Sequence, residues 1–288
     1  MTSESALARI VPVAAVLAAL LLVWYAAALP MNSGLPSFPA GGTLPERFVA
    51  AWSLERPVLP APHQIVAALW ASTVDMPVSS PRSLVFHAWI TLSSTLLGFA
   101  LGAVLGMALA IGIVHVRTLE RSLMPWLIAS QTIPILAIAP IVVVALGAVG
   151  ITGLVPKALI SMYLSFFPVA IGMTKGLTSP EPMLLDLIRT YSAGRVQTLL
   201  KLRLPAALPY LFASLKVAVA ISLVGAIVGE LPTGSSLGLG ARLLTGSYYG
   251  QTVQIWAALF AAAILAACLV QAVALAERLT AKAMGARP

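Results

Sequence analysis

The sequence predicts an all-α integral membrane protein with six transmembrane helices. The chain of 288 residues is 60% hydrophobic and only 9% charged, whereas soluble domains carry roughly a quarter charged residues. Apolar segments recur at the length of about 20 residues that a helix needs to cross a bilayer. Backbone polar groups find no water in the hydrocarbon layer, so these segments are expected to be helices.

Six segments qualify as spans, at about residues 10–29, 86–114, 123–147, 154–175, 209–231 and 253–276. An even number places both termini on one side. If that side is cytoplasmic, the 17 Lys and Arg residues divide into 11 inside and 5 outside, with Lys216 within the fifth span. The positive-inside bias therefore predicts cytoplasmic N and C termini.

The chain is expected to have three parts. Residues 1–30 hold an N-terminal segment and the first transmembrane helix, which we interpret as a retained span because its apolar run is too long for a signal peptide. Residues 31–85 form an external loop rich in Pro, Gly and Ser, in which 63–70 can form a short helix at the membrane interface. Residues 86–288 form the transmembrane core, with a cytoplasmic loop at about 179–209.

Several functions are disfavoured by what the sequence lacks. The single cysteine, Cys268, allows no intrachain disulfide and favours no metal cluster. No phosphate-cradling GxxxxGK[ST] motif occurs, so ATP hydrolysis is not expected in this chain. No cluster of His, Cys and carboxylate residues suggests catalysis, and no cofactor is expected. The basic residues are scattered between apolar segments, which favours a membrane topology over nucleic-acid binding.

Small residues and prolines mark the spans that pack closely or bend. Gly98, Gly102 and Gly106 recur at four-residue spacing in the second span, which lets helix backbones approach within one subunit or between two subunits. In the third span, Pro134 and Pro140 interrupt the helix. These two prolines are candidates for lining a pathway, or they fit bent neighbouring helices.

Few charged residues lie close to the spans. Glu230 ends the fifth span before a glycine-rich loop, and it is a candidate gate or contact residue. Alternatively, its carboxylate is solvated at the interface or bonds to loop amides. Lys216 is expected to extend to the interface, while His87 and Cys268 are interpreted as structural.

The loop at 179–209 has the pattern of two short helices. Ser179, Pro180 and Glu181 form a helix-start signal. An apolar face then recurs at helical spacing through Met183, Leu184, Leu187, Ile188 and Tyr191.

A break follows at residues 192–194, where Gly194 is suited to a left-handed turn. A second, basic helix is expected at 195–203, ended by Pro205. This pair is too short to form its own core, so its apolar face must pack on the rest of the protein or on a partner.

The segment resembles the cytoplasmic loop motif of binding-protein-dependent ABC importer permeases, in which Glu-Ala-Ala is followed by Gly and later by Leu-Pro. Aligned on Leu204 and Pro205, Asp186 takes the place of the Glu and Ser192 that of the Gly. Further matches are IPILAIAP in the third span and the Gly-Glu and Gly-Leu-Gly at 229–230 and 238–240. The resemblance covers about 60–288 and is strongest for the nitrate/sulfonate/taurine-type subgroup.

This resemblance implies a type I ABC importer-like fold in a bacterial inner membrane. The loop would be a coupling helix seated in a cytoplasmic ATPase, with contacts by Leu184, Leu185, Asp186, Ile188, Arg189, Tyr191, Ser192 and Gly194. The implied partners are a cytoplasmic ABC ATPase dimer, a second permease subunit of identical or related sequence, and a periplasmic or surface substrate-binding protein. The implied cargo is a small polar solute such as a sulfonate, a nitrate or a heterocyclic vitamin precursor.

Two other classes of protein were weighed against this interpretation. An ion-coupled secondary transporter usually needs carboxylates near mid-membrane and internal repeats, and an intramembrane enzyme needs ionisable residues deep in facing spans. The predicted spans contain almost no ionisable residues. Both alternatives are therefore disfavoured, with the secondary transporter as the second choice.

Overall fold

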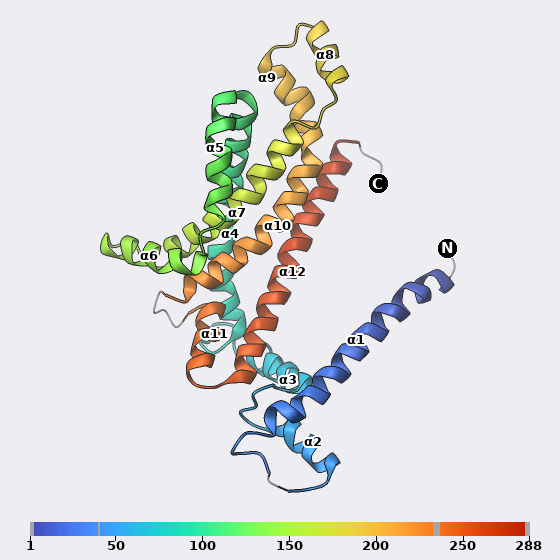
Figure 1. Ribbon diagram of the computed structural model, residues 1–288, viewed down its shortest axis with the longest axis vertical. Coiled ribbons are helices and arrows are strands. Elements are labelled where there is room, and N and C mark those ends of the chain that lie inside the picture. The colour runs from blue at the N-terminus through green and yellow to red at the C-terminus, as the bar shows by residue number, and fades with distance from the viewer. Residues whose placement is uncertain (1–2, 40, 233–236, 286–288) are drawn as a thin grey trace. The chain divides into compact units, whose positions relative to one another are not determined.

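The computed structural model describes residues 3–39, 41–232 and 237–285, and the regular structure in these ranges is entirely helical. The all-α prediction is therefore confirmed. The helices (Figure 1) are α1 Ser3–Asn32, α2 Leu44–Ser53, α3 Pro62–Thr73, α4 Leu84–His115, α5 Arg117–Ser130, α6 Ile135–Ala148, α7 Leu154–Leu177, α8 Pro182–Thr190, α9 Arg195–Thr198, the π-helix η1 Leu199–Arg203, α10 Leu204–Glu230, α11 Leu239–Tyr248 and α12 Thr252–Ala283.

Five helices in the described residues are long and apolar enough to cross a membrane. They are Val11–Asn32, Leu84–His115, Leu154–Leu177, Arg195–Glu230 and Thr252–Ala283. A sixth span is obtained if α5 and α6 are counted together, although they meet at a bend of 97°.

The predicted third span at 123–147 is thus not one kinked helix but two helices. Pro134 occupies the N-cap of α6 with extended backbone angles (φ −66°, ψ 121°), rather than a position inside a helix. A proline cannot donate a helical hydrogen bond and its ring collides with the preceding turn, so the chain breaks before it. Pro140 lies inside α6, where the helix continues.

The chain divides into two compact units. One consists of Met1–Phe86 and Arg242–Ala261, and the other of His87–Ala241 and Ala262–Pro288. Helices α4, α11 and α12 contribute residues to both units.

In the first unit, a buried asparagine at the end of α1 holds α2 and the loop between α2 and α3. The Asn32 side-chain amide donates to the carbonyls of Ala51 and Leu59, and its oxygen accepts the amides of Val58 and Leu59. The short helix expected at 63–70 is present within α3. Helix α2 was not predicted from the sequence, although its start carries a capping signal. Glu46 accepts a hydrogen bond at 2.8 Å from the amide of Thr43, three residues earlier.

In the second unit, α4, α7 and α10 pack through small residues. A Cβ added at Gly106 would lie 2.6 Å from the carbonyl oxygen of Phe166 on α7, and one at Gly98 or Gly102 would overlap the side chain of Ser161 or Ser165. The glycine stripe of α4 therefore serves packing within one subunit, which settles the alternative left open above for these residues.

Serine hydroxyl groups join the same three helices. Ser161 of α7 donates to the carbonyl of Ser222 on α10, and Ser222 donates to the carbonyl of Thr95 on α4, each at 2.9 Å. All three residues are fully buried. Helices α7 and α10 run antiparallel, because Gly176 meets Ala207 while Gly229 meets Lys157. Small side chains and interhelical hydrogen bonds are the features that hold helices together in lipid.

Candidate functional site

The first candidate site is the helical hairpin formed by α8, α9 and η1, at one end of the second unit (Figure 1). Helix α8 begins at Pro182, with Glu181 as its N-cap, so the predicted start at Ser179 is wrong. The Ser179 hydroxyl instead donates to the Gly176 carbonyl at 2.8 Å and closes the end of α7. Proline suits the first position of a helix because the amide there has no helical partner.

Helix α8 ends in a Schellman motif whose left-handed residue is Ser192. Ser192 has a φ of +53°, its amide donates to Arg189, and the amide of Ala193 donates to Ile188. The expectation that Gly194 takes the left-handed turn is wrong, because Gly194 is extended (φ −68°, ψ 169°) and caps α9. The turn therefore falls at the position where the resembling motif has its glycine.

The second arm of the hairpin continues directly into a span. Residues Arg195–Glu230 form one helix, so the prediction that Pro205 ends it is wrong. The turn before Pro205 is the π-helix Leu199–Arg203, in which Leu204 donates to the carbonyl of Leu199. In this wider turn the amide bonds to the carbonyl five residues earlier instead of four. In a regular α-helix the ring of Pro205 would collide with a carbonyl of the preceding turn, and π segments recur at such irregularities.

The first arm of the hairpin, α8, is largely exposed, and only Leu185 and Ile188 are half-buried. No residue of α8 is buried, and large apolar side chains face outward, with Met183 72% and Tyr191 78% exposed. Asp186 forms an ion pair with Arg189 at 2.9 Å, and both side chains are mostly exposed. The structure brings the predicted contact residues together on this one element, from Leu184 to Gly194.

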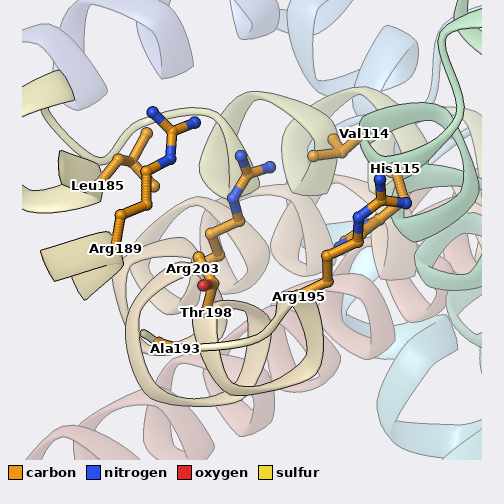
Figure 2. A pocket seen from close by; sticks show the side chains of 8 residues that line it. All are labelled: Val114, His115, Leu185, Arg189, Ala193, Arg195, Thr198 and Arg203. Carbon is orange, nitrogen blue, oxygen red and sulfur yellow. The ribbon is translucent and has the colours of Figure 1, made fainter. Parts of the chain in front are cut away.

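A pocket of about 330 Å³ lies between the hairpin and the end of α4. Figure 2 shows the side chains of Arg189, Arg195 and Arg203 extending to the same side of the hairpin. The remaining lining residues are Val114, His115, Leu185, Ala193 and Thr198. The sequence analysis predicted Arg189 as an ATPase contact and used Arg195 and Arg203 only for topology, and it did not predict a shared pocket.

The second candidate site surrounds Glu230, at the other end of α10. Glu230 is only 1% exposed, so the expectation of a solvated carboxylate is wrong. The Thr91 hydroxyl donates to one carboxylate oxygen at 2.8 Å, and the Gly240 amide donates to the other at 2.7 Å. The alternative in which the carboxylate bonds to loop amides is the one that the structure shows.

The Gly-Leu-Gly turn at 238–240 completes the Glu230 site. The Leu239 amide donates to Thr91 and the Gly238 amide donates to Nδ1 of His87, both at 2.9 Å. Nδ1 thus acts as an acceptor, which places the proton of a neutral His87 on Nε2. Gly238 has a φ of +118°, and a Cβ added there would overlap the Glu230 carboxylate.

Two lysines near the spans interact with acidic residues. Lys157, one of the five charges counted as outside, is buried on α7 and attracts Glu230. Lys216, expected to extend to the interface, forms an ion pair with Glu277 of α12 at 2.5 Å. The 61 residues that separate these partners explain why local pattern did not reveal the pair.

The remaining candidates are less enclosed. Pro134 and Pro140 are both exposed. Cys268 is exposed as well. Within the described residues, no three His, Cys, Asp or Glu side chains gather as a metal site.

A set of long apolar helices with a projecting helical hairpin defines a multi-pass membrane protein. Residues 102–285 match the family described as "Binding-protein-dependent transport system inner membrane component", and the chain belongs to this family. It is therefore the transmembrane permease of an ABC importer, a transport protein rather than an enzyme.

Relatives with assigned cargo are similar over most of their length. The "Riboflavin transport system permease protein RibX" of Chloroflexus aurantiacus is 32% identical over 222 residues, 77% of this chain and 79% of the relative. The "Formylaminopyrimidine transport permease protein ThiX" of Halalkalibacterium halodurans is 34% identical over 198 residues, 68% and 74% of the two chains. The "Putative aliphatic sulfonates transport permease protein SsuC" of Bacillus subtilis is 28% identical over 245 residues, 83% and 85%.

Proposed function

We propose that the α8–α9 hairpin is the coupling element that links this permease to a separate cytoplasmic ATPase. The observation that carries the proposal is the exposure of α8, which has no buried residue and directs Met183, Leu187 and Tyr191 outward. An amphipathic helix gains stability by placing its apolar face in a groove of a partner. The contact residues are Leu184, Leu185, Asp186, Ile188, Arg189, Tyr191, Ser192 and Gly194.

The complete importer is proposed to contain two permeases, two ATPases and an external substrate-binding protein in a bacterial inner membrane. The two permeases are either identical or related in sequence. The N and C termini lie on the cytoplasmic side. The C-terminal end of α12 supports this orientation, because it lies at the same end of the second unit as the hairpin (Figure 1). Closure of the ATPases would shift the hairpins and reorient the spans as rigid bodies.

The translocating core is proposed to be 86–288, preceded by the first span at 1–30 and an external segment at 31–85. The family match at 102–285 supports this boundary. The cargo is proposed to be a small polar solute delivered by the binding protein. The names of the relatives support this class, because they refer to riboflavin, formylaminopyrimidine and aliphatic sulfonates.

Pro134, Pro140 and Glu230 are proposed to act along the transport pathway. The exposed prolines of α6 can face a second permease, where freed backbone groups can meet solute. Glu230 holds the 238–240 turn through the Gly240 amide, and it thereby controls the position of that turn relative to the end of α10. Uptake measured after Pro134→Ala and Pro140→Ala tests the pathway role, and unchanged uptake by both variants rejects it.

The coupling role is tested in the reconstituted complex of permease, ATPase and binding protein. Asp186→Asn and Tyr191→Ala are expected to reduce substrate-stimulated ATP hydrolysis by at least about fivefold, the lower range of allosteric coupling effects. Arg121→Gln, an exposed change on α5, is the control and is expected to leave stimulation unchanged. A normally assembled complex with full stimulation in both hairpin variants would reject the proposal.

A further inference from the structure

The pocket between the hairpin and α4 has an unusual charge balance. Its lining includes Arg189, Arg195 and Arg203, and Asp186 pairs with Arg189 alone. Neither Arg195 nor Arg203 forms an ion pair with a carboxylate of the described residues. Two guanidinium groups therefore face one small cavity with no carboxylate of the described residues beside them.

The neutral groups of the pocket do not offset this charge. Nδ1 of His115 lies 2.8 Å from the carbonyl of Ile111, and a carbonyl only accepts, so Nδ1 carries a proton. The Thr198 hydroxyl donates to the carbonyl of Gly194 at 3.1 Å, which leaves its oxygen as an acceptor. The pocket is thus a cluster of positive charge, and its like charges repel one another until an anion enters.

The size and position of the pocket indicate the class of anion. Its volume of about 330 Å³ is at the lower end of the range of small-molecule sites, about 300–1,000 Å³. Arginine groups bind phosphate oxygens in pairs of parallel hydrogen bonds. The walls come from the end of the long apolar helix α4, from α8, α9 and the turn between them, and from Arg203 of η1. Helix α9 and η1 form the start of the apolar helix Arg195–Glu230. A phosphate group at the membrane surface is therefore within reach.

We propose that this pocket binds a phosphate group, supplied either by an anionic lipid headgroup or by free inorganic phosphate. The bound anion lies between Arg195 of α9 and Arg203 of η1, beside the end of α4. It thereby links two parts of the second arm of the hairpin. The large exposed apolar side chains Met183, Leu187 and Tyr191, which suit a protein partner, are not part of the pocket lining.

The experiment measures binding to the full-length permease in detergent, without ATPase. Delipidated protein is titrated with short-chain phosphatidylglycerol, short-chain phosphatidylcholine and inorganic phosphate, and bound species are counted by native mass spectrometry and equilibrium dialysis. The double variant Arg195→Gln/Arg203→Gln is expected to bind the preferred anion at least about tenfold more weakly, because it removes both guanidinium groups that can donate charge-assisted hydrogen bonds to phosphate. Lys201→Gln removes a charge from η1 outside the pocket lining and is expected to change binding by less than about twofold.

Each titration has a defined outcome. Stronger binding of phosphatidylglycerol than of phosphatidylcholine, lost in the double variant, identifies an anionic lipid headgroup. Binding of inorganic phosphate that is lost in the double variant identifies a soluble anion. Absence of binding, or equal loss in Lys201→Gln, overturns the proposal. Weakened ATPase assembly in the double variant with unchanged anion binding also overturns it, because it assigns the arginines to an acidic protein surface. Because the titrations contain no ATPase, the anion-binding result does not depend on the proposed coupling role of α8.

Discussion

The two ends of the helix Arg195–Glu230 differ in how completely this chain buries and hydrogen-bonds the residues near them. The helix Arg195–Glu230 contains 36 residues, which is about 54 Å at 1.5 Å per residue. At one end, Glu230 is buried and both carboxylate oxygens accept hydrogen bonds. At the other end, α8 is exposed and its ion pair lies in solvent. The comparison suggests that the Glu230 end is needed for folding and the hairpin end for assembly.

The largest effect on folding is expected from Glu230→Ala. The change leaves the Gly240 amide and the Thr91 hydroxyl without the carboxyl oxygens to which they donate, and each buried donor left without a partner costs about 1–3 kcal/mol. The measurement is thermal unfolding of the purified permease in detergent. The exposed change Glu181→Gln is the control with nearly unchanged stability. Equal melting of Glu230→Ala and wild type would show that the two ends do not differ in this way.

A second test compares two glycines, to separate the steric effect of an added Cβ from the strain of a positive φ. Gly238 and Gly250 both have positive φ, but a Cβ at Gly238 would overlap Glu230, whereas a Cβ at Gly250 would meet nothing within 4 Å. Gly238→Ala is expected to be more destabilising than Gly250→Ala by about 1–3 kcal/mol, the usual cost of overpacking. Denaturation midpoints of the two variants give this difference. Equal midpoints would contradict the close packing of the 238–240 turn against Glu230.

A substitution in the hairpin turn is expected to have a smaller effect on stability, and to stabilise rather than destabilise. Ser192→Gly is expected to stabilise the end of α8 by up to about 1 kcal/mol, because a non-glycine residue in the left-handed region costs roughly 1–2 kcal/mol and glycine loses more chain entropy. Hydrogen exchange of the Ala193 amide, which bonds to Ile188, reports this change. Gly194→Ala is the comparison, and it is expected to be tolerated because Gly194 is extended and open. Faster exchange in Ser192→Gly would contradict the assignment of the turn.

The smallest effect on stability is expected from Asp186→Asn. The ion pair with Arg189 is 70–75% exposed, and exposed pairs contribute about 0–1 kcal/mol. The melting temperature is therefore expected to stay within about 2 °C of wild type, since 1 kcal/mol shifts a larger protein by roughly 2–4 °C. If this variant melts much earlier, its loss of coupling in the ATPase assay would report misfolding instead of a lost contact.

Local pattern was sufficient for much of this fold. Five of the six predicted spans followed from the length of apolar runs, whereas 123–147 forms two helices that meet at a bend. The hairpin followed from the apolar spacing of Met183, Leu184 and Leu187. The position of α3 and the glycine stripe of α4 were also readable, because they depend on residues close together in sequence. The capping pair of Thr43 and Glu46 could have revealed α2.

What the sequence did not reveal depends on long-range contacts. Thr91 and Glu230 are 139 residues apart, and His87 and Gly238 are 151 apart, so no periodicity joins them. His87 and Thr91 are four residues apart and so share a face of α4, but the turn that covers them is visible only in the fold. The helix boundaries around Pro134 and Pro205 were misassigned because a proline can start a helix or follow a π-turn as well as end one.

The unbroken course of the chain from Arg195 to Glu230 has a mechanical consequence. No loop lies along this length, so there is no slack in which a displacement of the second hairpin arm can be lost. The places where the helix can flex are the wider turn at Leu199–Arg203 and the interior proline Pro209. A displacement of this arm must therefore either bend the helix at one of these two places or move the far end, with the buried Glu230 and the 238–240 turn, along with it.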